Sequence, residues 1–367
     1  MKVICNRGAL LEALTVAGNV IATRTPKPIL LCVKLSATKD SLTISATDLE
    51  ASIRFTDHQV QVEQEGEVLV AADKLRDIVR ESVDDTLSIE VIGETANIKG
   101  ADSVFKIFTQ KPVDFPNVPG FVGEAHFQVV GGSLKKLIAR TQFATAKESS
   151  RYAFNGVLLN AKNKKIHMVA TDGRRLASAE GDMLPGTMDK EGKKAIIPAK
   201  ALGLIDKLVE DPEEAVGFQI TETQIIVNTS SATMTSILLE GQFPPYDDVI
   251  PKDADKKMVA GTADFLSAIR RASLLANEES KGVRLNFTKK GLIITSRSPE
   301  AGEATINFSC KYEGADVEIG FNPNFLMEAL KVVDTDEFSL ELSAPNRPGL
   351  LKAGVDFQYV IMPVNLQ

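Results

Sequence analysis

The sequence predicts an α+β protein built from three repeated domains. Three observations indicate this fold class: the length of 367 residues, a two-strand pattern that occurs three times, and helical patterns flanking each copy. At this length one hydrophobic core is usually not enough, so two or three domains are expected. Hydrophobic residues make up 44% and charged residues 25% of the chain, a composition that excludes wholesale disorder.

A pair of strands joined by a short polar turn recurs along the chain. The copies begin at Leu35, Leu159 and Leu285, and each has apolar residues seven and nine positions after its Leu. Alternation of apolar and polar residues is typical of a half-buried antiparallel pair, because successive side chains of a strand point to opposite faces. Repetition in the same order indicates a triplicated unit.

Helical patterns and closing prolines recur in step with these hairpins. The opening helices are expected over 7–21, 133–143 and 262–275, and the second helices over 72–81, 198–208 and 322–331. Further short β-runs are expected over 86–92, 104–109, 218–227 and 234–239. The units end on Phe115-Pro116, Phe243-Pro244 and Met362-Pro363. We therefore expect domains at 1–121, 122–247 and 248–367, each with helices on one face of antiparallel sheet.

Charge distribution is more informative than net charge. The net charge of −7 argues against a protein that grips nucleic acid over its whole surface. The segment 133–147 nevertheless has four basic residues and no acidic one. If the helices share one face, that face is basic on an acidic body; the alternative is an ordinary solvated helix surface.

Residues that carry chemistry are scarce. The histidines His58, His126 and His167 are scattered, and neither a glycine-rich phosphate loop nor a Gly-x-Ser-x-Gly motif occurs. We therefore expect no catalytic residue, no metal and no cofactor. Three widely spaced cysteines fit a reducing cytoplasm, and no apolar stretch is long enough for a transmembrane helix or a signal peptide.

Two segments leave alternatives open. The stretch 171–176 leaves a strand and carries adjacent arginines, Arg174 and Arg175. It is either a turn with two solvated arginines or the wall of a groove, with Leu176 on its floor. The apolar stretch 359–367 is either a packed last strand or part of a pocket for an apolar peptide.

A family resemblance emerges from motifs spread over the full length. The motifs are Thr-Asp-Leu-Glu at 47–50, Asp-Phe-Pro-Asn at 114–117, Arg-Tyr-x-x-Asn-Gly at 151–156, Ala-Thr-Asp-Gly-x-Arg-Leu-Ala at 170–177, Gly-Val-Arg-Leu at 282–285, Ile-Gly-Phe-Asn at 319–322 and Tyr-Val-x-Met-Pro at 359–363. In this order and within this repeat, they resemble the bacterial DNA polymerase III β subunit family, the DNA sliding clamps.

The resemblance implies a particular assembly and function. Two chains would join head to tail into a ring with pseudo-six-fold symmetry, with helices inside and antiparallel sheets outside. Double-stranded DNA would pass through the ring and be contacted independently of sequence. The DNA polymerase III α subunit, the clamp loader, other polymerases and mismatch-repair proteins would dock through short linear motifs. The protein would be a cytoplasmic, non-catalytic processivity factor.

The resemblance also assigns site residues. The peptide-binding pocket would comprise Phe154, Thr171, Gly173, Arg174, Arg175, Leu176, Pro244, Val249, Val360, Met362, Pro363 and Val364. DNA would be contacted by Arg24, Lys147 and Tyr152. Charge alone adds Lys135, Lys136, Arg140 and Lys200. The dimer interface would use Phe105, Ile107, Leu274 and Leu275. The chain departs from the best-known members at Ala153, Arg174, Asp248, Asn365 and Gln367.

Two other classes of function compete with the clamp. A phosphate-handling enzyme could use Asp172, Arg174 and Arg175, but it needs a general base and a metal or phosphate loop nearby. A monomeric three-domain adaptor could bind partner peptides without encircling DNA.

Overall fold

The computed structural model describes residues 1–21, 24–147, 153–186, 192–276 and 282–365. The chain divides into two compact units. Unit 1 comprises Met1–Gly132, Met183–Lys190 and Lys200–Leu238, and unit 2 comprises Ser133–Asp182, Glu191–Ala199 and Leu239–Gln367. The division falls inside the second repeat, so compactness does not follow the repeat boundaries.

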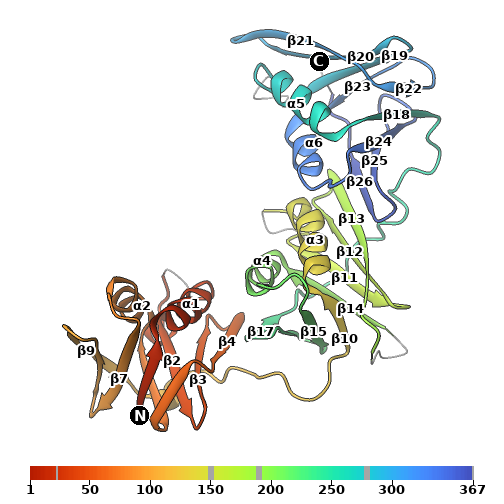
Figure 1. Cartoon of the computed structure of the whole chain (residues 1–367). Coiled ribbons are helices and arrows are strands. Elements are labelled where there is room, and N and C mark those ends of the chain that lie inside the picture. Colours follow the sequence, from red (N-terminus) through yellow and green to blue (C-terminus); the bar gives the residue numbers. More distant parts are fainter. Residues whose placement is uncertain (22–23, 148–152, 187–191, 277–281, 366–367) are drawn as a thin grey trace. The chain divides into compact units, whose positions relative to one another are not determined.

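Unit 1 is built on one 13-stranded sheet with the order β10-β15-β16-β17-β4-β3-β2-β6-β9-β8-β7-β1-β5. Figure 1 labels several of its strands, among them β2, β3 and β4. Its strands are β1 Lys2–Asn6, β2 Cys32–Thr38, β3 Ser41–Thr47, β4 Ala51–Asp57, β5 Val60–Gln64, β6 Gly66–Ala71, β7 Thr86–Ile92, β8 Thr95–Lys99, β9 Val104–Gln110, β10 Phe127–Val130, β15 Ala215–Ile220, β16 Gln224–Asn228 and β17 Ala232–Ile237. Its helices are α1 Arg7–Gly18, α2 Ala72–Glu81, the short 3-10 helices η1 Pro28–Leu31 and η2 Pro112–Asp114, and most of α4 Ala199–Leu208.

Unit 2 contains a nine-stranded sheet, β14-β11-β12-β13-β26-β25-β24-β18-β22, and a four-stranded sheet, β21-β20-β19-β23. Its strands are β11 Gly156–Lys162, β12 Lys165–Thr171, β13 Arg175–Asp182, β14 Lys193–Pro198, β18 Lys256–Gly261, β19 Val283–Thr288, β20 Gly291–Ser298, β21 Gly302–Phe308, β22 Lys311–Glu313, β23 Val317–Phe321, β24 Glu337–Leu342, β25 Gly349–Ala353 and β26 Phe357–Ile361. Its helices are α3 Gly131–Thr141, which begins at the end of unit 1, η3 Gln142–Ala144, α5 Thr262–Ser273 and α6 Pro323–Leu330.

The strand register confirms the triplicated hairpin. In β2–β3, Leu35 lies opposite Ile44, nine positions later, and the other two hairpins repeat this spacing from Leu159 and Leu285. Each hairpin also closes with two residues between its last paired positions. A register slip of one residue would move every side chain to the other face, so the shared register reflects a shared core.

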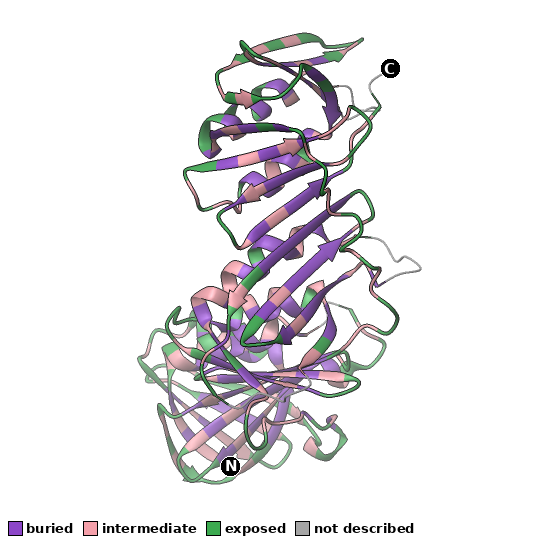
Figure 2. Ribbon diagram, turned by 90° about the vertical axis from the view of Figure 1, so that its right-hand side faces the viewer, coloured by how far each residue is buried: buried purple, intermediate pink, exposed green. Residues whose placement is uncertain are grey.

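The helices cover the sheets with their apolar faces. In unit 1, α1 packs against α2 and over β3 and β4, and in unit 2, α5 packs against α6 and over β20 and β21. The Asn6 side chain accepts a hydrogen bond from the Ala9 amide (3.1 Å) and caps α1. Leu10 and Leu14 of α1 are buried, and each contributes about 2 kcal/mol through apolar burial. Figure 2 shows buried residues alternating with partly buried ones along the strands.

All six expected helices are present, and their ends differ from the expected ones by at most three residues. The expected run 218–227 was wrong as a single strand. It spans the end of β15 and most of β16, which are joined by a turn in which Thr221 and Gln224 exchange hydrogen bonds. Thr side chains can close such a turn without the glycine or proline that usually indicates one.

Candidate peptide pocket, DNA surface and chain interface

The turn 171–175 joins β12 to β13 and is stabilised by hydrogen bonds among its own residues. The Thr171 hydroxyl donates to the Arg175 carbonyl (2.7 Å) and accepts from the Gly173 amide (3.1 Å). One carboxylate oxygen of Asp172 accepts from the amides of Arg174 (2.9 Å) and Arg175 (3.1 Å). Gly173 has φ +85°, a conformation that glycine adopts without strain. The loop therefore holds exposed Gly173 and Arg174 in a fixed position.

The first repeat contains the same turn. The Thr47 hydroxyl donates to the Ala51 carbonyl (2.9 Å) and accepts from the Leu49 amide (3.0 Å), while Asp48 accepts from the next two amides. Leu49 takes the glycine position with φ +79°. The second carboxylate oxygen of Asp48 pairs with Lys200 of α4, whereas that of Asp172 pairs with Arg175 (3.0 Å). In both turns, the Thr and Asp side chains thus form hydrogen bonds with the backbone of the turn, and a Lys or Arg pairs with the second carboxylate oxygen of the Asp.

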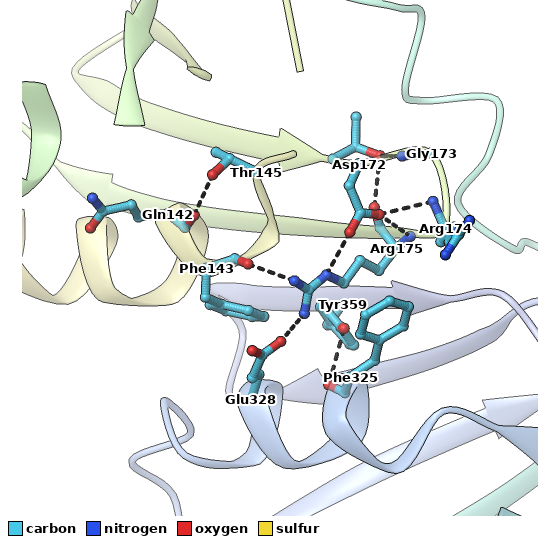
Figure 3. Close-up of polar contacts among 11 residues, drawn as sticks. Gln142, Phe143, Thr145, Asp172, Gly173, Arg174, Arg175, Phe325, Glu328 and Tyr359 are labelled. Atoms are coloured by element: carbon cyan, nitrogen blue, oxygen red, sulfur yellow. Dashed lines mark hydrogen bonds and ion pairs between the residues drawn. The ribbon is translucent and has the colours of Figure 1, made fainter. Parts of the chain in front are cut away.

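Arg175 is buried beneath the turn, with only 5% of its surface exposed. Its guanidinium pairs with Asp172 and with Glu328 of α6, and it donates to the Phe143 carbonyl (2.7 Å; Figure 3). It also lies over the rings of Phe325 (4.3 Å) and Phe143 (5.4 Å). The alternative of two solvated arginines is therefore wrong for Arg175, whose guanidinium is surrounded by the protein's own groups, while its place in the peptide pocket stays a prediction.

Tyr359 of β26 lies beside this cluster. Its ring packs against Phe143 at 5.7 Å, and its hydroxyl donates to the Phe325 carbonyl at 3.1 Å. Burial raises the pKa of the Tyr359 hydroxyl well above its ordinary value, so the group stays protonated and remains a donor. The network joins η3, β13, β26 and α6 within unit 2.

The remaining pocket residues lie on unit 2, and two of them, Leu176 and Val360, belong to one buried apolar cluster. These two are buried and lie opposite each other on β13 and β26. Phe243 and Tyr246 pack against the cluster from the segment that includes Pro244. The pocket prediction thus concerns a surface with a buried apolar floor.

The C-terminal segment is both a packed strand and an extension beyond it. The β26 strand ends at Ile361, and the Met362 amide then donates to the Arg174 carbonyl at 2.9 Å. The Val364 amide donates to the Gly320 carbonyl, also at 2.9 Å. Met362 is 43% exposed, and Val249 is 51% exposed. The segment is held beside the turn, with apolar groups reaching solvent. Of the remaining pocket residues, Thr171 is buried and Phe154, Pro244, Pro363 and Val364 are half-buried.

The structure corrects one expected DNA contact. Arg140 of α3 has a side chain only 1% exposed and forms ion pairs with Asp334 (2.6 Å) and Asp356 (2.9 Å). Lys136 pairs with the same two carboxylates. Partial burial acts to raise the pKa values of these carboxyls, but Lys136 and Arg140 outweigh it and hold both pKa values below their ordinary range. Arg140 stabilises unit 2 and does not face a ligand.

The other expected DNA contacts differ in their surroundings. Arg24 and Lys147 are exposed, and Lys135 is half-buried. Lys200 is 56% exposed while paired with Asp48. Tyr152 lies outside the described residues. The basic character of 133–147 is thus partly neutralised by acidic residues from far along the chain.

The expected interface residues lie at sheet edges and a helix end. The β9 strand pairs with β8 along 104–108 but meets β6 only at Thr109 and Gln110, so one backbone edge of 104–108 is unpaired within the described chain. Phe105 is 41% exposed on this edge and Phe108 is 85% exposed. Leu274, directly after α5, is 76% exposed; Ile107 and Leu275 are half-buried. Phe108 lies in the same strand but on the opposite face from Phe105 and Ile107.

Among the described residues, no group of three or more His, Cys, Asp or Glu could hold a metal ion. His167 lies within β12 as expected, and its ring bonds the Ser178 hydroxyl (2.7 Å). Burial lowers the pKa of His167. No helix within the described residues has the length and apolarity needed to cross a membrane.

Comparison with known proteins agrees with the triplicated architecture. Models of the DNA polymerase III beta subunit match most of the chain: the N-terminal domain at 1–119, the central domain at 128–245 and the C-terminal domain at 247–365. The beta sliding clamps of Pseudomonas putida and Vibrio cholerae are 33% and 31% identical, over all of both chains. The crystal structure of the DNA polymerase III subunit beta from Pseudomonas aeruginosa matches with a TM-score of 0.94 at 32% identity, again over all of both chains. The polymerase sliding clamp from Bacillus subtilis matches with a TM-score of 0.95 at 28% identity, also over all of both chains.

The repeat, the shared hairpin register and these similarities define a three-domain protein of DNA-clamp fold. The chain belongs to the DNA polymerase III beta subunit family, and its function is that of a DNA sliding clamp for DNA polymerase III.

Proposed function

We propose that two copies of this chain join head to tail into a closed ring that encircles duplex DNA. The repeated strand pairing carries this proposal: β4 of the first repeat pairs with β17 of the second, and β13 of the second pairs with β26 of the third, so an equivalent pairing could join the third repeat to the first repeat of a partner chain. Phe105 and Ile107 would meet Leu274 and Leu275 of the partner chain. The exposure of Phe105 at an unpaired strand edge and of Leu274 after α5 supports this, since large exposed apolar side chains favour contact with a partner.

The ring would stay on DNA because it encloses the duplex. This fits the modest number of positive charges that α3 has available for DNA. Tight binding needs many phosphate contacts and weakens steeply with salt. With Arg140 buried and Lys136 paired, few cations of α3 are available, and contact would be independent of sequence. Such a surface would let the ring slide.

The pocket residues would bind short linear motifs of partner proteins. The polymerase α subunit, the clamp loader, other polymerases and mismatch-repair proteins would each insert apolar or aromatic side chains beside Met362 and Val249. The ring would perform no chemistry and would act in the cytoplasm on chromosomal DNA. The rival phosphate-handling site is disfavoured because Arg175 is committed to Asp172 and Glu328.

The test is retention on closed circular DNA after loading by a clamp loader. The ring predicts that the clamp persists on the circle in high salt and leaves once the circle is cut. Loss that follows salt alone would indicate ordinary electrostatic binding. Sedimentation separates the ring from the adaptor: the ring predicts a dimer of twice 39.7 kDa, and the adaptor predicts a monomer.

A further inference from the structure

A polar cavity lies in unit 1 between strands β2 to β4 and the segment that follows β9. Its volume is about 440 Å³, within the range of small-ligand sites. The strands contribute Lys34, Ser36, Thr43, Ser45 and Arg54, while β6 contributes Glu67 and the covering segment contributes residues 112, 113 and 115–118.

The cations of the cavity stand in one row across three strands. Lys34 lies opposite Ser45 on β3, and Ser45 lies opposite Arg54 on β4. Since neighbouring strands are about 4.8 Å apart, the two cationic residues start from backbone positions about 10 Å apart with a hydroxyl between them. Ser36 and Thr43 lie two residues along the same face, so the cavity offers further hydroxyl groups.

Of the two cations, Lys34 has a carboxylate partner and Arg54 has none among the described residues. Glu67 accepts from Lys34 (2.9 Å) and from Ser36 (2.8 Å), and these contacts lower the pKa of Glu67. Arg54 is half-buried, and the described residues provide its guanidinium with no carboxylate. A Cβ atom at Gly120 would lie 3.2 Å from its Nη1, so the guanidinium lies close to the covering chain. A half-buried guanidinium without an acceptor favours an anionic ligand.

The internal repeat shows what occupies the same place in the second domain. Superposing the hairpins by their shared register matches Lys34, Ser45 and Arg54 with Leu158, Val169 and Ser178. Leu158 and Val169 are buried in the apolar cluster beneath the proposed peptide pocket. The first domain therefore has cations and hydroxyls where the second has an apolar floor.

The neighbouring strand pair, β4 and β17, also has polar residues where the second repeat has apolar ones. Ser52 lies opposite Thr235, at the position that Leu176 and Val360 occupy in the second repeat. Thr235 is 5% exposed, and its hydroxyl oxygen is buried without a hydrogen-bond partner in the described structure. Ser52 and Thr235 do not line the cavity, but beside it they replace apolar residues that belong to the predicted peptide pocket of the second repeat.

We propose that this cavity binds a carboxylate of an extended acidic peptide segment, with Arg54 as its bidentate partner and Thr43 and Ser45 as hydroxyl donors. The choice of a peptide rests on the proposed peptide pocket, to which this cavity is related by the repeat. The anionic nature of the ligand rests only on the charges of the cavity itself.

Fluorescence anisotropy with the intact protein tests the proposal. The probe is a labelled six-residue peptide of alternating Asp and Val, and its matched control has Asn in place of each Asp. We expect the acidic peptide to bind and the Asn peptide to bind at least about tenfold more weakly, because a charge-assisted bidentate contact is lost. Arg54→Gln should reduce binding of the acidic peptide by a similar factor. Lys39→Gln, which removes an exposed cation from the β2–β3 turn outside the cavity, should not change it.

Equal binding of the two peptides, or equal losses in Arg54→Gln and Lys39→Gln, would overturn the site. Binding of inorganic phosphate that depends on Arg54, without binding of the acidic peptide, would overturn the peptide assignment. Thermal unfolding of each variant verifies folding. An apolar clamp-binding peptide is titrated in parallel and should bind Arg54→Gln unchanged; its failure to bind any variant would count against the proposed peptide pocket alone.

Discussion

Replacing Arg175 by Ala should destabilise unit 2 and loosen the turn that presents Arg174. The substitution leaves Asp172 and Glu328 without their cation and removes two ring contacts. Breaking a buried ion pair costs about 3–5 kcal/mol. The side chain of Glu328 is 37% exposed and can be hydrated, so we expect the lower end, about 3 kcal/mol. In the first repeat, Ala51 stands at the position of Arg175. The carboxylate of Asp48 there pairs with Lys200 instead, so an alanine at this position leaves no carboxylate without a cation.

Chemical denaturation, monitored by probes in unit 2, measures the loss in the free energy of unfolding. Titration with a clamp-binding peptide measures the affinity of the pocket. Arg174→Ala is the matched control: this side chain is exposed, so stability should change by less than about 0.5 kcal/mol. A double-mutant cycle with Glu328→Gln should give a coupling energy of at least about 1 kcal/mol. If Arg175→Ala unfolds like the wild type, or if the cycle shows no coupling, the bracing role is refuted.

Three further predictions concern other parts of the chain. Removing residues 362–367 should abolish binding of partner peptides in titration while sedimentation still shows a dimer; unchanged affinity would count against the pocket. The pair Leu274→Lys and Leu275→Lys should yield monomers in sedimentation, because two charges would be buried in an apolar contact; a surviving dimer would contradict this placement. A hydrogen bond with Glu12, partial burial and repulsion from neighbouring carboxylates raise the pKa of Glu210 from 4.5 to about 7. The folded state then binds more protons than the unfolded state between these values, so this group lowers stability as pH rises from about 4.5 to 7. Glu210→Gln should match the wild type in thermal unfolding at pH 4 and exceed it at pH 8, by less than about 1 kcal/mol because the group is largely exposed; an equal gain at both pH values would exclude the carboxylate as the cause.

The repeated elements could be predicted from sequence because they depend on local patterns. Period-2 alternation after Leu35, Leu159 and Leu285 is sufficient to locate the hairpins, and the same order in three copies corrects for ambiguity in any one. The turn at 221–223 was not predicted because the hydroxyl of Thr221 closes it without a glycine or proline.

The roles of individual arginines could not be predicted in this way. Arg140 and Arg175 stand in basic stretches, and sequence spacing cannot reveal that Asp334 and Glu328 reach them from far along the chain. Whether a cation faces solvent is a property of tertiary packing. Arg174 and Arg175 are neighbours in the sequence, yet the first is exposed and the second is buried.

The Thr-Asp turn is absent from the third repeat, where Arg297 and Ser298 take the places of Thr47 and Asp48. Ser298 has no negative charge with which to anchor a lysine or arginine of a following domain. In the proposed ring, the first two domains of a chain are linked to their successors by peptide bonds, whereas the third meets another polypeptide. In such a ring the seam between polypeptides would lack both the covalent link and an ion pair like the one between Asp48 and Lys200 of the following domain, so we expect the ring to open there.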